Sequence, residues 1–186
     1  MTAHPIYIRG RHVILRDFQL DDVEEAYTVM GDDRVTRSLS FDSRTRDQVG
    51  VLIQDAINRS EQQPRNEFYL AVASSEGDRL IGFARLGLSG VKAAKLGYAI
   101  RADEWGRGYA TDSVRTLLNF GFQELSLHRV SAAIGPENIA SIAIAKRLRF
   151  QYEGRIRDHV FTNNAWRDSL LYSILAGEWV PNAEPV

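Results

Sequence analysis

Two glycines one residue apart, Gly106 and Gly108, flank Arg107 in the segment EWGRGYATDS (104–113). The strand-like stretch KLGYAI (95–100) precedes this segment, and a helical pattern follows it. A helix N-terminus carries about half a positive charge and several N–H groups without partners, and glycines there let the backbone approach an anion closely. The segment is therefore a candidate cradle for a pyrophosphate, although a tight turn has the same pattern. Its spacing matches neither the ATP-binding P-loop nor the Gly-x-Gly-x-x-Gly dinucleotide fingerprint.

A second pair of polar residues, Asn138 and Ser141, stands three positions apart in GPENIASIAIAKRLRF (135–150). This spacing is typical of a helix start with Asn138 as N-cap and Ser141 in the first turn. The same side chains could also contact a ligand bound at the helix start. The residues alone leave both interpretations open.

Strands and helices must alternate in order to position these segments. Strand patterns occupy 6–16, as one strand or as two that divide at Gly10, and 68–74, 80–89, 95–100 and 129–134. A final hairpin turns at Asn163-Asn164. Helical patterns occupy 20–30, 46–63, 109–125 and 138–148. Because the strands come in hairpins and also flank helices, the sequence predicts an α/β (α+β) fold with a mixed sheet.

Composition excludes several classes of protein. The 186 residues, 44% of them hydrophobic, suit one domain, which we place at 1–180 with a flexible tail at 181–186. The net charge of −1 argues against nucleic acid as a partner, and the absence of cysteine excludes disulfides and thiolate chemistry. The four histidines are dispersed, so no metal site is expected. Neither a secretory signal nor a membrane span is evident, which predicts a cytoplasmic protein with no membrane partner.

Several motifs, in this order, resemble the GNAT superfamily of acyl-CoA N-acyltransferases: ILR, LGYAI, EWGRGYAT, ENIASIAIAKRLRF, YEGRIRD and DSLLYSILAGEW. They are most similar to its RimJ/RimL branch, named for enzymes that acetylate ribosomal-protein N-termini. The family loop reads Gln/Arg-x-x-Gly-x-Gly/Ala, and Trp105 takes its first position here. The resemblance implies a twisted mixed sheet of about seven strands with about four helices. It also implies that the sheet is splayed between the fourth and fifth strands, where pantetheine lies.

The resemblance further implies acetyl-CoA as co-substrate and assigns roles to individual residues. Backbone amides from Arg107 to Thr111 would hold the CoA pyrophosphate, and Asn138 would hydrogen-bond the cofactor or the acyl region. Ser141 matches the serine proposed in this branch to protonate the leaving thiolate. Many relatives use a tyrosine four positions later, where this chain has Ala145. The implied cofactor-binding set is Tyr98, Ala99, Ile100, Trp105, Gly106, Arg107, Gly108, Tyr109, Ala110, Thr111 and Asn138.

Two positions depart from the pattern of the family. Arg149 stands where the branch often has glycine, so that turn must differ or carry a basic side chain. Lys95 stands where many relatives have a glutamate suggested as a route to a general base. Lys95 is either an exposed strand residue or a contact to an acidic substrate. An α-amine with a pKa of about 7.7–8.0 is partly neutral near pH 7.5, whereas an ε-amine near 10.4 is not, so Lys95 favours α-amine acceptors.

The remaining candidate residues are isolated. Asp168 has either a structural role or a contact to the acceptor, and the hairpin residue His159 is either solvated or catalytic. Phe41, Phe68 and Tyr69 either line an acceptor pocket or fill the core. The predicted function is acetyl transfer from acetyl-CoA to a primary amine, with a peptide N-terminus favoured. The alternatives are a small-molecule acceptor or a CoA-binding module without catalysis, and the protein could form a homodimer.

Overall fold

The computed structural model describes residues 5–181, so 1–4 and the 182–186 part of the predicted tail lie outside the described residues. The strands are β1 (Tyr7–Arg9), β2 (Val13–Asp17), β3 (Glu67–Ser74), β4 (Leu80–Leu88), β5 (Ala93–Ile100), β6 (Arg129–Ile134), β7 (Gln151–Thr162) and β8 (Ala165–Leu175). The helices are α1 (Val23–Met30), α2 (Asp33–Thr36), α3 (Arg46–Ser60), α4 (Tyr109–Gln123) and α5 (Ile139–Arg147). Short 3-10 turns lie at Leu20–Asp22, Ala102–Glu104 and Ala176–Glu178.

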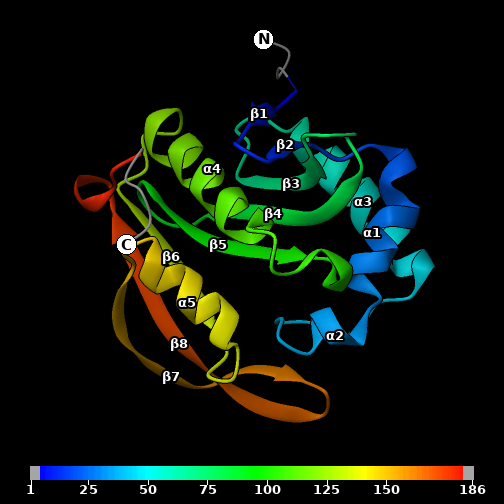
Figure 1. Cartoon of the computed structure of the whole chain (residues 1–186). Coiled ribbons are helices and arrows are strands. Elements are labelled where there is room, and N and C mark those ends of the chain that lie inside the picture. Colours follow the sequence, from blue (N-terminus) through cyan, green and yellow to red (C-terminus); the bar gives the residue numbers. More distant parts are fainter. Residues whose placement is uncertain (1–4, 182–186) are drawn as a thin grey trace.

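The strands form one sheet in the order β1-β2-β3-β4-β5-β6-β8-β7 (Figure 1). Neighbouring strands pair antiparallel except β5 and β6, which pair parallel. The fold is therefore mixed α+β, as the sequence predicts. The sheet has one strand more than expected because the chain turns back at Gly10 and divides the first segment into β1 and β2. A Cβ at Gly10 would lie 2.5 Å from Thr116 Oγ1, so only glycine fits this turn as it stands.

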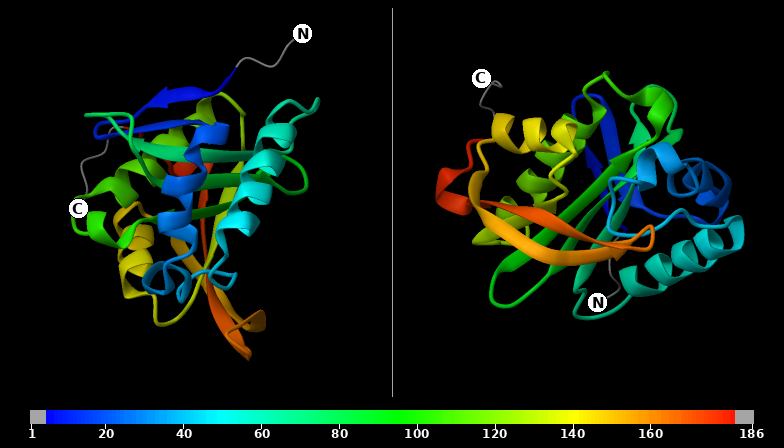
Figure 2. Two further views of the ribbon diagram at one scale, coloured as in Figure 1. Left: turned by 90° about the vertical axis from the view of Figure 1, so that its right-hand side faces the viewer. Right: turned by 90° about the horizontal axis from the view of Figure 1, so that it is seen from below.

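Helices cover both faces of the sheet (Figure 2). On one face α4 and α5 pack over a core that includes Leu70, Leu86 and Leu117. On the other face α1 and α3 enclose a second core around Met30 and Ile53. The four-residue α2 was not predicted, because it is too short to show a hydrophobic period.

The hairpin of β7 and β8 extends beyond the rest of the sheet (Figure 2). Its turn places Asn163 and Asn164 at φ 52° and 56°, the left-handed region that asparagine tolerates. Near this turn, the guanidinium of Arg167 donates to the carbonyls of Arg37 at 2.6 Å and Leu39 at 2.5 Å. The hairpin is thereby attached to the loop that follows α2. None of the helices between residues 5 and 181 has the length and apolar character of a membrane span.

Candidate functional site

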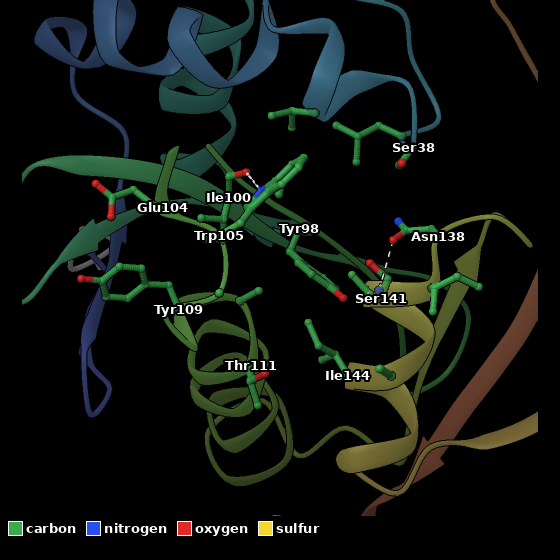
Figure 3. A pocket seen from close by; sticks show the side chains of 18 of the residues that line it. Ser38, Tyr98, Ile100, Glu104, Trp105, Tyr109, Thr111, Asn138, Ser141 and Ile144 are labelled. Atoms are coloured by element: carbon green, nitrogen blue, oxygen red, sulfur yellow. Dashed lines mark hydrogen bonds between the residues drawn. The ribbon is translucent and has the colours of Figure 1, made fainter. Parts of the chain in front are cut away.

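A gap opens inside the sheet where β5 and β6 diverge. The two strands pair only from Ala93 to Lys95 on β5, so the rest of β5 has no strand on that side. A cavity of about 540 Å³ lies against this part of β5, between the start of α4 and the start of α5 (Figure 3). The divergence corresponds to the splay expected from the sequence, with strand numbers raised by one because of the extra hairpin. A cavity of this size fits a small organic ligand.

The start of α4 forms one wall of the cavity. Gly106 and Gly108 have φ of 78° and 81°, which L-residues rarely adopt, and Gly108 is the N-cap of α4. Within residues 5–181, the backbone amides from Arg107 to Thr111 donate to no other group, since the first bond of the helix runs from the amide of Asp112 to the carbonyl of Gly108. Consecutive unpaired amides at a helix N-terminus bind anions such as a pyrophosphate.

The side chain of Arg107 is already paired. Its guanidinium lies 2.9 Å from the Glu104 carboxylate, and it is not among the cavity-lining residues. Glu104 also lies 3.8 Å from the guanidinium of Arg79. The positive end of the site therefore depends on the backbone amides more than on the Arg107 charge.

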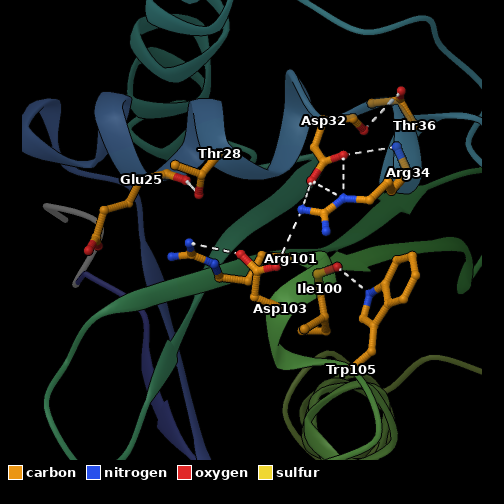
Figure 4. Close-up of polar contacts among 9 residues, drawn as sticks. All are labelled: Glu25, Thr28, Asp32, Arg34, Thr36, Ile100, Arg101, Asp103 and Trp105. Atoms are coloured by element: carbon orange, nitrogen blue, oxygen red, sulfur yellow. Dashed lines mark hydrogen bonds and ion pairs between the residues drawn. The ribbon is translucent and has the colours of Figure 1, made fainter.

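Trp105 connects residues 104–108, the candidate cofactor loop, to the end of β5. Its indole N–H donates to the carbonyl of Ile100 at 2.8 Å, and half of the side chain stays exposed on the cavity (Figure 4). Along a strand, the backbone N–H and C=O groups of successive residues point alternately to the two neighbouring strands. The amide of Arg101 donates to the carbonyl of Ile81 beside β4, so the backbone of Ala99 also faces β4. The backbone groups of Tyr98 and Ile100 therefore face the gap. The backbone of Tyr98 thus remains available to an extended ligand, whereas the carbonyl of Ile100 is occupied.

Asn138 and Ser141 lie at the start of α5 and both line the cavity. The Asn138 side-chain oxygen accepts the Ser141 amide at 3.1 Å, which is the helix-cap arrangement. The Ser141 hydroxyl faces the side chain of Tyr98 across the cavity (Figure 3). The family resemblance implies a role for the backbone of Tyr98 but none for its side chain. The strand period, which puts Leu96, Tyr98 and Ile100 on one face, was the signal for this side chain.

A second wall, absent from the sequence analysis, comes from α2 and the loop after it. Val35, Ser38 and Leu39 line the cavity opposite α5. Arg34 also lines it, and its guanidinium lies 2.7 Å from Asp32 and 3.3 Å from Asp103 (Figure 4). These contacts connect α2 to the 3-10 turn that leads into the cofactor loop.

Neither residue proposed for the acceptor lines the cavity. The side chain of Lys95 is exposed and forms no hydrogen bond or ion pair with any residue from 5 to 181. The Asp168 carboxylate accepts the Asp158 amide at 2.8 Å and pairs with Arg155. The hydrogen bond from the Asp158 amide, and to a smaller extent that from Arg155, lowers the pKa of Asp168. Both contacts lie within the hairpin, as expected of a carboxylate with a structural role.

The other candidates lie outside the cavity. Phe68 and Tyr69 are buried in the two cores, and Phe41 packs against Phe83, with ring centroids 6.3 Å apart. His159 Nδ1 lies 2.9 Å from the Ser169 hydroxyl on the hairpin. In the part of the chain that the structure describes, no three His, Cys, Asp or Glu side chains cluster as metal ligands would.

Comparison with known proteins assigns the chain to a family. The sequence model of the Acetyltransferase (GNAT) domain matches residues 12–151. An uncharacterized N-acetyltransferase, p20 of Bacillus licheniformis, is 30% identical over 168 residues, which cover 89% of this chain and 93% of that protein. The chain therefore belongs to the GNAT family of acetyltransferases, and it is an acyl-CoA-dependent N-acyltransferase.

Two further relatives are ribosomal-protein acetyltransferases. The [ribosomal protein uS5]-alanine N-acetyltransferase of Escherichia coli is 26% identical over 117 residues, or 61% of this chain and 60% of that enzyme. The structure of RimL, a ribosomal L7/L12 α-N-protein acetyltransferase in complex with coenzyme A, shares the fold with a TM-score of 0.79 at 19% identity. This match covers 91% of our chain and 98% of RimL. The protein is thus RimJ/RimL-like within its family.

Proposed function

We propose that this enzyme transfers an acetyl group from acetyl-CoA to the α-amine of a protein or peptide N-terminus by direct attack. The observation that carries the proposal is the row of unpaired amides from Arg107 to Thr111, at the N-terminus of α4, beside the gap between β5 and β6. The amides suit the pyrophosphate of CoA, and the free edge of β5 suits the extended pantetheine arm. We propose that the acyltransferase domain spans residues 1–180 and needs no metal.

In the proposed reaction a neutral amine attacks the thioester carbonyl. A backbone amide at the end of β5, that of Tyr98 being turned toward the gap, stabilises the negative oxygen that develops. The carbon–sulfur bond then breaks, and Ser141 at the start of α5 gives its proton to the sulfur. Asn138 contributes by holding the first turn of α5, and thus Ser141, in place.

The preference for an α-amine rests on two observations. The E. coli relative is named for acetylating the alanine of a ribosomal protein. In addition, the cavity wall supplies no histidine that could deprotonate a strongly basic amine. An acceptor that is already partly neutral near pH 7.5 needs less assistance.

The test is release of free CoA thiol in the presence of matched acceptors. We would compare a short peptide that has a free N-terminal alanine with the same peptide blocked at its N-terminus and carrying one lysine, and with a polyamine. We expect turnover with the first peptide at least tenfold above the others. Equal or higher turnover with the polyamine would instead establish a small-molecule acceptor. Binding of acetyl-CoA without turnover on any amine of a broad panel would contradict the proposal as a whole.

A further inference from the structure

The side chain of Tyr98 enters the cavity from β5 and ends beside Ser141 on α5 (Figure 3). Its hydroxyl is fully buried and makes no complete hydrogen bond with any residue from 5 to 181. A buried hydroxyl without a partner costs free energy, and such groups in native proteins call for an explanation. The Ser141 hydroxyl lies beside the phenol, but the two hydroxyls form no aligned hydrogen bond.

The phenol of Tyr98 can serve only as a neutral donor. Burial raises its pKa above the ordinary value near 10, and the nearby Ser141 hydroxyl opposes this shift only in part. Tyr98 therefore keeps its proton throughout the range in which amines are acetylated. As a neutral hydrogen-bond donor it can orient a neighbouring acceptor.

The Ser141 hydroxyl needs orientation. The cap by Asn138 fixes the backbone of Ser141, but the hydroxyl accepts and donates no hydrogen bond with complete geometry in the described part of the chain. A serine in a helix readily turns its only proton back to a carbonyl of the preceding turn. In that rotamer the proton is directed away from the reacting sulfur.

We infer that Tyr98 is a positioning residue whose hydroxyl donates to Ser141 Oγ and thereby directs the Ser141 proton toward the sulfur of the thioester. The inference rests on the proposed role of Ser141. When the carbon–sulfur bond breaks, its electron pair goes to sulfur and the Ser141 proton follows. Ser141 regains a proton that the attacking nitrogen loses, and Tyr98 stays protonated throughout.

The test is a double-mutant cycle of Tyr98→Phe and Ser141→Ala on kcat with acetyl-CoA and the best acceptor. Tyr98→Phe keeps the ring and removes only the hydroxyl. We expect it to lower kcat about tenfold while the KM for acetyl-CoA stays within about twofold. We expect Ser141→Ala to lower kcat about 100-fold, and the double variant to be no slower than Ser141→Ala. Tyr152→Phe removes the hydroxyl of an exposed tyrosine on β7 that does not line the cavity, and it is the matched control.

The outcomes separate this inference from the proposed function. Multiplicative losses in the double variant would show that Tyr98 acts independently of Ser141 and would overturn the inference. An unchanged kcat in Tyr98→Phe would overturn it as well, as would a loss in Tyr98→Phe when Ser141→Ala is fully active. If the parent binds no acetyl-CoA in a thermal-shift assay, the proposed function itself fails, and this result is obtained before any variant is made.

Discussion

The carboxylate of Asp112, in the first turn of α4, accepts a hydrogen bond of 3.1 Å from the backbone amide of Val13, 99 positions earlier. The same carboxylate accepts the amides of His12 at 2.7 Å and Arg11 at 3.3 Å. A single buried side chain thus holds the turn between β1 and β2 against the helix that begins at the cofactor loop. The turn at the edge of the sheet is therefore attached to the helix whose N-terminus forms one wall of the candidate site.

The first prediction follows from this contact. Asp112→Ala leaves three backbone donors without their charged acceptor and should lower the free energy of unfolding by about 3 kcal/mol. Urea denaturation measures the change. Asp55→Ala, an exposed aspartate on α3, is the control and should lie within about 0.5 kcal/mol of the parent. Equal stabilities for the two variants would mean that the Asp112 contacts contribute nothing net.

The second prediction concerns Gly108 and the amides of α4. Acetyl-CoA at millimolar concentration should raise the Tm of the parent by mass action. Gly108→Ala strains a position with φ of 81° and displaces the amides from their anion-binding arrangement, so it should weaken acetyl-CoA binding at least tenfold. Gly90→Ala imposes the same kind of strain at φ 68° in an open loop, where the added carbon meets no atom within 4 Å. It should lose stability but keep the ligand-induced shift. If acetyl-CoA raises the Tm of Gly108→Ala as much as that of the parent, the amides at the start of α4 do not bind acetyl-CoA.

The third prediction concerns Lys95. Because its side chain is exposed and lies outside the cavity, Lys95→Glu should change kcat/KM for an α-amine by no more than about twofold. Lys92→Glu makes the same change of charge three residues earlier and is the control. The two variants should be assayed on an α-amine and an ε-amine from pH 6.5 to 9. A loss above tenfold that is confined to Lys95→Glu would show that the ammonium contacts the acceptor.

The fourth prediction is a dependence of stability on pH. Hydrogen bonds from Arg129 and then Ser173 lower the pKa of Glu153 to about 2. The folded-state pKa lies below the unfolded value near 4.3, so the Glu153 carboxylate stabilises the fold above pH 4.3. This contribution disappears as the pH falls toward 2. It is small because a third of the Glu153 side chain is exposed, so that water screens its interaction with Arg129.

Glu153→Gln tests this dependence. The variant should have a lower Tm than the parent at pH 5–7, and the two should converge near pH 2. Glu61→Gln removes an exposed carboxylate that forms no ion pair with a described residue, and it should follow the parent at every pH. A constant Tm difference between Glu153→Gln and the parent across this range would contradict the assignment.

Local patterns made the fold and the turn before α4 predictable. Gly106 and Gly108 adopt the positive φ values that their spacing suggests, and Asn163-Asn164 forms the predicted turn. Arg149 adopts φ 64° at the end of α5, in the left-handed region that glycine favours, so this turn carries a basic side chain. In each case the conformation depends on a few neighbouring residues.

Contacts between distant residues were not predictable in the same way. The side chains of Tyr98 and Ser141 lie close together only because β5 and α5 face each other across the gap. The sequence of either segment alone does not predict this contact. The sequence does not predict that Arg107 pairs with Glu104, because this ion pair depends on the path of the intervening turn. The wall formed by Ser38 and Leu39 comes from a loop without any periodic signal, and Arg167 of β8 holds it in place.

The divergence of β5 from β6 gives this sheet two additional edges, in its interior rather than at its margins. Edge strands ordinarily invite pairing with any extended chain, and proteins protect them by covering or capping. The inner edge of β5 is flanked by α4 and α5, and its far end is capped where the indole of Trp105 occupies the carbonyl of Ile100. An extended guest that pairs with the inner edge of β5 therefore finds the carbonyl of Ile100 already occupied by Trp105.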